Sequence, residues 1–260
     1  MDAYELTVEQ ESTLRKAQTM LLNDCMRRFK FNGQFTAPPL SPLGVAVQNR
    51  RQVLDEEQAK RSGYHRFSMS DGKSDTGPER NGSPPAAARA VSDVMNGTVS
   101  SYLGSAVPAG GCVGEAQRKI VEGAPWPKGV QNDQASLGNF VSGLHGQAYQ
   151  STQADPRFQQ VVKRWSDCMR RFGYAYRKPD DAVLDKRWRG AGVSQTEIKT
   201  AVADVRCKKE VNYVGAQAVL QAAYERKLAD RNAEALRTVQ RLNETRMKNA
   251  ARVLSGRQPA

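Results

Sequence analysis

The chain has 260 residues, four cysteines, two histidines and a formal net charge of +12. Leu, Ile, Val and Phe supply only 48 of its residues, a composition close to that of disordered chains, so we expect both folded parts and parts that do not pack. No run of 18 apolar residues could span a membrane, and the common phosphate-loop, dinucleotide, zinc-protease and serine-hydrolase motifs are absent. Two lone histidines, His65 and His145, are too few for a histidine-rich metal site, so we expect no metal, no cofactor and no catalytic residues.

The first half of the chain predicts short helices separated by turn residues. A helix should begin at the capping box Thr7-x-x-Gln10 and end at Asn32-Gly33. Residues 33–85 read mostly as connection, with one short helix after Asp55 and a flexible Pro/Gly/Ser-rich loop over 70–85. Further helices are expected over residues 86–96, 112–122 and 133–144.

The second half predicts longer helices. Asp155-Pro156 begins one that should end at Gly173, and the capping box Ser194-x-x-Glu197 begins another. Residues 213–254 then form a polar helical pattern, interrupted only by Gly215, which should pack along one edge or project. Convincing strand patterns are absent, so the predicted fold class is all-α.

An internal repeat is the sharpest feature of the sequence. The string Asp24-Cys25-Met26-Arg27-Arg28-Phe29 recurs letter for letter at residues 167–172. Cys112-x-x-Glu115 is likewise matched by Cys207-x-x-Glu210. We therefore expect two diverged helical modules, residues 1–150 with an insertion at about 33–85, and residues 151–260 with a long basic C-terminal helix.

Four cysteines allow three disulfide connectivities. The repeat favours Cys25–Cys112 and Cys168–Cys207, one bond within each module. Such disulfides persist outside the cytosol, and each stabilises a fold by roughly 2–4 kcal/mol. The alternatives are four buried free thiols, a zinc site or a catalytic cysteine; the C-x-x-C spacing typical of zinc is missing.

The excess charge lies in the second half. Residues 1–150 carry 16 basic and 15 acidic side chains, whereas residues 151–260 carry 23 and 12. This asymmetry favours an anionic partner, although a solvated basic face is the plainer interpretation. The repeated Arg-Arg pairs could hold a phosphate or carboxylate, or simply complement the helix dipole.

Three strings resemble a known family: residues 110–118 (GGCVGEAQR), 165–176 (WSDCMRRFGYAY) and 194–210 (SQTEIKTAVADVRCKKE). They are similar to exported proteins and lipoproteins of Streptomyces and related actinobacteria, and the resemblance runs from Leu6 to Leu254. It implies a secreted or membrane-anchored protein at the cell surface, with no catalytic residues to carry over. The first residues here lack a signal peptide and a lipobox cysteine, so the chain is either cytosolic or a mature form without its leader.

The leading hypothesis is a non-enzymatic extracytoplasmic binding or accessory protein of the bacterial cell envelope. Its basic face would contact an anionic envelope component, a peptide or a protein partner. Three clusters that mix aromatic and basic residues are the candidate contacts, although each could equally be a core aromatic flanked by solvated charges. Their members are Lys163, Arg164, Trp165, Tyr174, Tyr176, Arg177, Lys178, Lys186, Arg187, Trp188 and Arg189.

Three alternatives remain open. A surface immunity protein that sequesters a toxic peptide would suit the same location. A nucleic-acid-binding protein is permitted by a pI near 9.7, but no recognised motif supports it. An envelope hydrolase could use the acidic cluster Asp180, Asp181 and Asp185 for acid–base work, although these carboxylates more plausibly offset neighbouring cations.

Overall fold

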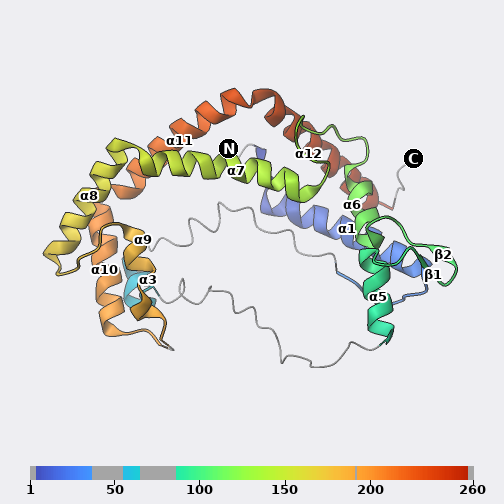
Figure 1. The fold of residues 1–260 in the computed structure, drawn as a ribbon, viewed down its shortest axis with the longest axis horizontal. Coiled ribbons are helices and arrows are strands. Elements are labelled where there is room, and N and C mark those ends of the chain that lie inside the picture. Colours follow the sequence, from blue (N-terminus) through green and yellow to red (C-terminus); the bar gives the residue numbers. More distant parts are fainter. Residues whose placement is uncertain (1–3, 37–54, 65–85, 191, 257–260) are drawn as a thin grey trace. The chain divides into compact units, whose positions relative to one another are not determined.

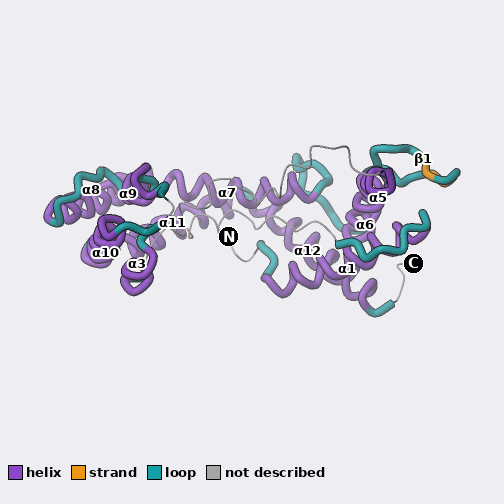
Figure 2. The backbone as a smooth tube through the Cα atoms, turned by 90° about the horizontal axis from the view of Figure 1, so that it is seen from below, coloured by secondary structure: helices purple, strands orange, loops and turns teal. Residues whose placement is uncertain are grey.

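The computed structural model describes residues 4–36, 55–64, 86–190 and 192–256. The regular elements among these residues are helices, apart from one hairpin of two-residue strands, which confirms the all-α class (Figures 1 and 2). No helix within these ranges is long and apolar enough to cross a membrane. The elements are α1 (Val8–Arg28), α3 (Glu56–Ser62), α5 (Ala86–Asn96), β1 (Ser101–Tyr102), β2 (Ser105–Ala106), α6 (Gly111–Val121), α7 (Gln134–Ala154), α8 (Pro156–Arg171), α9 (Pro179–Val183), η2 (Lys186–Trp188), α10 (Gln195–Glu210), α11 (Tyr213–Arg231) and α12 (Ala233–Leu254).

Two compact units make up the chain. The first comprises residues Met1–Ser41, Glu79–Leu137 and Asn232–Ala260. Its helix α1 begins as predicted, with Thr7 and Gln10 bonding each other's backbone N–H groups. Helix α1 packs against α6 and α12, and α5 packs against α6. One core cluster joins α1, α6 and α12, and another joins α1, α5 and the start of α6.

The second unit comprises residues Pro42–Pro78 and Gly138–Arg231. Its main core lies among α3, α8, α9 and α10, and a smaller cluster lies between α8 and α11. The short α3 begins at the predicted cap Asp55 and ends at Gly63, where φ is +51°. A side chain at Gly63 would meet Glu197 of α10, because its Cβ would lie 2.8 Å from Glu197 Cγ. The glycine therefore lets the end of α3 dock on α10.

The units divide the chain differently from the two predicted halves. Helix α12 belongs to the first unit because it packs on α1 and α6, and α3 belongs to the second because it packs on α10. The excess charge is divided accordingly. Residues 138–231 carry 17 basic and 10 acidic side chains, and α12 carries five basic and two acidic ones.

Three element predictions need correction. The helix expected over 133–144 continues to Ala154, and the pattern over 213–254 is two helices separated at Asn232, whose φ is −115°. The β1–β2 hairpin was not expected, and its tip uses Leu103 and Gly104 at positive φ. The loop predicted over 70–85 lies outside the described residues.

Candidate functional site

The first copy of the repeat builds a helix junction. Cys25, in the last turn of α1, is bonded to Cys112 in the first turn of α6, with Cα atoms 5.5 Å apart. Arg27 pairs with Asp24 on the same helix, and Arg28 pairs with Glu115 of α6. Beyond the helix, the Phe31 N–H donates to the Met26 carbonyl oxygen over 3.1 Å.

The second copy builds a similar junction, except that its second cysteine, Cys207, lies in the last turn of α10 rather than in the first turn of a helix. Cys168 of α8 is bonded to Cys207 of α10, with Cα atoms 5.6 Å apart. Arg170 pairs with Asp167, and Arg171 pairs with Glu210. The Tyr174 N–H donates to the Met169 carbonyl oxygen over 3.0 Å. Both predicted disulfides are thus confirmed, and no free cysteine is found.

These contacts give every polar residue of the repeated string a structural partner. Each arginine next to the methionine binds the aspartate of its own helix, and the following arginine binds the glutamate of the C-x-x-E segment. Cations in the last turn also complement the helix dipole. The repeat therefore specifies a stapled helix end, and its arginines are already engaged with carboxylates.

The two tryptophans among the predicted contacts lie in the core. Trp165 is fully buried, and its Nε1 donates to Asp204 Oδ1 over 2.9 Å. Trp188 is 2% exposed, and its Nε1 donates to the Ala182 carbonyl oxygen over 2.6 Å. Both tryptophans are therefore core residues flanked by charges, and not surface contacts, because neither ring can reach a ligand from the surface.

A buried ion pair accompanies Trp165. Lys208 Nζ donates to Asp204 Oδ2 over 2.8 Å, and both side chains are almost wholly inaccessible. Burial raises the pKa of Asp204, while the neighbouring Lys208 opposes that shift. Burial, reinforced by the charge of Asp204, also raises the pKa of Tyr64 well above its usual range. Sequence reasoning did not identify this group; its one signal was an Asp-x-x-x-Lys spacing on a buried helix face.

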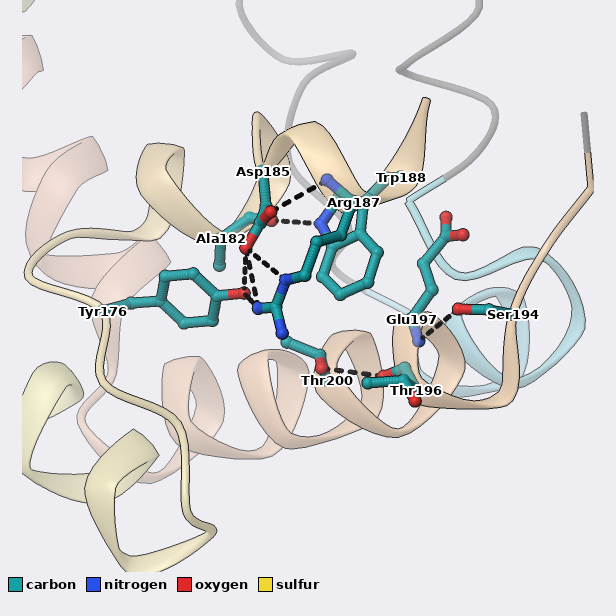
Figure 3. Close-up of polar contacts among 9 residues, drawn as sticks. All are labelled: Tyr176, Ala182, Asp185, Arg187, Trp188, Ser194, Thr196, Glu197 and Thr200. Carbon is teal, nitrogen blue, oxygen red and sulfur yellow. Dashed lines mark hydrogen bonds and ion pairs between the residues drawn. The ribbon is translucent and has the colours of Figure 1, made fainter. Parts of the chain in front are cut away.

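Tyr176, Asp185 and Arg187 form a compact polar cluster at the surface (Figure 3). The Tyr176 hydroxyl donates to Asp185 Oδ2 over 2.7 Å, and Arg187 binds the same carboxylate and the phenol oxygen. Hydrogen bonds from Arg187 lower the pKa of Asp185 to about 2. Burial and the hydrogen bond to Asp185 raise the pKa of Tyr176 to about 12. Arg187 also lies 4.9 Å from the centre of the Trp188 ring.

The acidic residues in and near this cluster have local structural roles. Asp185 caps η2 by accepting from the Arg187 N–H over 3.0 Å. Asp181 accepts from the Lys178 N–H at the start of α9, and Asp180 lies in the first turn of that helix. The arrangement is that of caps and an ion pair rather than of two carboxylates facing a shared space.

The remaining predicted cations lie at the surface. Lys163 pairs with Asp167 at 3.4 Å, and Tyr174 is half-buried against the core. Five of the predicted contact cations are exposed and form no ion pair with any residue in the described ranges: Arg164, Arg177, Lys178, Lys186 and Arg189.

One surface depression of the second unit involves a predicted contact residue, Arg164. The depression lies beside the second disulfide, where α8 meets the end of α10. Its lining residues are Arg164, Asp167, Cys168, Arg171, Glu210 and Val211.

No group of three or more candidate metal-ligand side chains occurs in the described parts of the chain. His145 is 3% exposed, and its Nδ1 lies 3.1 Å from Glu225 Oε1. His65 lies outside the described residues.

Comparison with protein-family models, with curated proteins and with solved structures gives no match. The site must therefore be interpreted from its own geometry.

Proposed function

We propose that this chain is a non-enzymatic binding or accessory protein of a bacterial cell envelope. It acts outside the cytoplasm and contacts an anionic partner through the second unit. The observation that carries the proposal is the set of exposed cations, Arg164, Arg177, Lys178, Lys186 and Arg189, which have no ion-pair partner among the described residues. Exposed cations that form no ion pair can attract and orient an anionic surface.

The disulfides support the proposed compartment. Both bonds are buried, with each sulfur-bearing residue at most 1% exposed. Disulfides of this structural kind persist in secreted and surface proteins and are rare in a reducing cytosol. The roles of Asp181 and Asp185 as caps support a binding role over hydrolysis, because these carboxylates already have partners.

The compartment is tested by mapping disulfides in protein purified without reductant from the cells that make it. We expect Cys25–Cys112 and Cys168–Cys207 in nearly all molecules. Four thiols open to alkylation would contradict an extracytoplasmic location.

The binding role is tested by retention on an immobilised sulfated polysaccharide across a salt gradient. Reversing Arg177, Lys186 and Arg189 to Glu should move elution to clearly lower salt, because screened charge contacts provide the affinity. The matched control reverses three exposed cations of the first unit, Arg15, Lys16 and Lys30. Equal shifts for the two triple variants would indicate that only net charge matters and would argue against a binding surface on the second unit.

A further inference from the structure

The two copies of the repeat differ in what covers them. In the first unit, Leu21 of α1 and Ala116 of α6 are buried against Ala250 and Val253 of α12. Counted from the aligned cysteines, their equivalents in the second unit are Arg164 and Val211, which line the open depression. Among the described residues of the second unit, no helix therefore lies over this depression as α12 lies over the equivalent face in the first.

The glutamates that pair with Arg28 and Arg171 also differ in how much of the side chain is exposed. Glu115, which binds Arg28, is 16% exposed, whereas its equivalent Glu210, which binds Arg171, is 55% exposed. The junctions share the disulfide, the arginine ion pairs and the hydrogen bonds at the end of the first helix. They differ in that Glu115 lies within α6 and also pairs with Lys119, whereas Glu210 is the last residue of α10. The exposure of Glu210 therefore reflects both its place at the end of α10 and the absence of a helix over it among the described residues.

The stripe of α8 that corresponds to the apolar stripe of α1 is polar. Leu14, Ala17 and Leu21 form the stripe of α1 that lies in the core cluster with α12. The equivalent positions on α8 are Arg157, Gln160 and Arg164, and all three are exposed. Arg157 already pairs with Asp155, but an apolar helix surface would bury Gln160 and Arg164 without polar partners of its own, so we expect the occupant of this face to carry polar or charged groups.

We propose that this depression receives an acidic α-helix of a protein partner, which lies where α12 lies in the first unit. This inference rests on the proposed function and names the partner class for it. The charged lining residues are Arg164 and Arg171 against Asp167 and Glu210. Lys163 and Arg170 beside the depression pair with Asp167, and Arg171 pairs with Glu210, so Arg164 is left without an ion pair among the described residues. Helix α12 of a second copy is a poor occupant, because its five basic and two acidic side chains would face like charges.

The spacing of the arginines specifies the partner further. Arg164 and Arg171 lie seven residues apart on α8, which is two turns or roughly 10 Å. One carboxylate of a partner helix would bind the guanidinium group of Arg164. A second carboxylate two turns away would share Arg171 with its present partner, Glu210. A small apolar residue between them would lie over Val211, as Ala250 and Val253 lie over Ala116 in the first unit.

The test uses the oxidised full chain and two labelled helical peptides of about 20 residues, long enough to hold helical structure. One peptide carries Glu residues two turns apart with Ala between them. The other has the same composition, with the Glu residues moved to the opposite face. We expect the first peptide to bind more tightly in fluorescence anisotropy, and Arg164→Glu to weaken it by about tenfold or more.

Two further variants make the result specific to the depression. Arg164→Leu installs the residue of the first copy and should weaken the first peptide several-fold while keeping the fold, as checked by circular dichroism. Lys199→Glu changes an exposed cation of α10 that does not line the depression, and its affinity should match that of the unchanged protein.

Equal binding of the two peptides, or binding that Arg164→Glu leaves intact, would overturn the acidic helix as the partner. Retention on the sulfated polysaccharide is measured separately and does not require a helix. Retention without selective peptide binding would thus refute this inference alone, and loss of retention would refute the proposed function.

Discussion

The ionised form of Asp185 is stabilised by hydrogen bonds from the Tyr176 hydroxyl and from the backbone N–H and the side chain of Arg187. Because its pKa is lowered to about 2 in the folded chain, ionisation of Asp185 stabilises the fold. That stability is present above the pKa of the unfolded chain, near 4, and is lost as the pH falls toward 2. The carboxylate is only 18% exposed, but its partner is exposed, so solvent screening limits the effect to about 1 kcal/mol.

We therefore predict that Asp185→Asn removes part of the acid sensitivity of the second unit. Denaturant titrations at pH 6, 4 and 3 should show a smaller fall in the free energy of unfolding than in the unchanged protein. Asp180→Asn is the control, because Asp180 is exposed and makes no such cluster. The same pH dependence in both variants would assign the acid sensitivity to other carboxylates.

The buried pair Asp204–Lys208 leads to a second prediction at this scale. Lys208→Met should destabilise the second unit by about 3–5 kcal/mol, because it leaves the carboxylate of Asp204 buried without its cation. The double variant Asp204→Asn with Lys208→Met should cost less than Lys208→Met alone. Denaturant unfolding measures both changes, with Lys209→Met as the control because Lys209 is exposed. A double variant that is destabilised as much as Lys208→Met, or more, would show that the two side chains do not stabilise each other.

At the scale of the element, the ends of α1 and α8 share the string from the aspartate to the phenylalanine and differ in the residue that follows it. Lys30 follows α1 with φ at +68°, and its equivalent Gly173 follows α8 with φ at +85°. The backbone N–H at this position donates to the carbonyl oxygen of Arg27 in the first copy and to that of Arg170 in the second. Left-handed backbone costs a residue with a side chain roughly 1–2 kcal/mol, whereas glycine adopts it freely.

Exchange of these residues should therefore have opposite effects. We predict that Gly173→Lys destabilises the second unit by about 1 kcal/mol, and that Lys30→Gly stabilises the first by about 0.5 kcal/mol. The gain is smaller because glycine also makes the unfolded chain more flexible. Denaturant midpoints of the two variants check the signs, and a loss of stability from Lys30→Gly would mean that the lysine side chain contributes to packing.

Helix starts were predictable because the chemistry of a cap is local. Thr7, Asp55, Asp155 and Ser194 each accept a backbone N–H from the first turn that they precede. Helix ends were harder. Helix α7 runs past Gly143 and Gly146 because Leu144, Ala148 and Thr152, one turn apart, are buried, and packing outweighs the weak preference of glycine against helices.

The candidate site was predictable only in part for a similar reason. A tryptophan between basic residues looks the same in sequence whether its ring is a contact or a core residue, and burial of Trp165 and Trp188 depends on distant elements. The Asp204–Lys208 pair also depends on that burial. The disulfides were predictable because the cysteines move with an exact repeat, whereas the polar stripe of α8 became visible only when both junctions could be compared.

At the scale of the whole molecule, each unit has its own core. The four core clusters of the described residues each draw on one unit only, two in the first and two in the second. Each unit also holds one disulfide, Cys25–Cys112 or Cys168–Cys207. Elements that share no buried cluster can unfold separately, as contiguous cooperative units do.

We therefore predict that loss of one disulfide weakens one unit. In the chain-entropy description the second bond, with a sequence separation of 39, contributes about 4 kcal/mol. The first bond, with a separation of 87, contributes about 0.7 kcal/mol more. Cys168→Ala with Cys207→Ala should speed hydrogen exchange in α8 and α10 while α1 and α6 keep their protection, and Cys25→Ala with Cys112→Ala should do the reverse. Equal loss of protection in both units would show instead that the chain unfolds as one cooperative body.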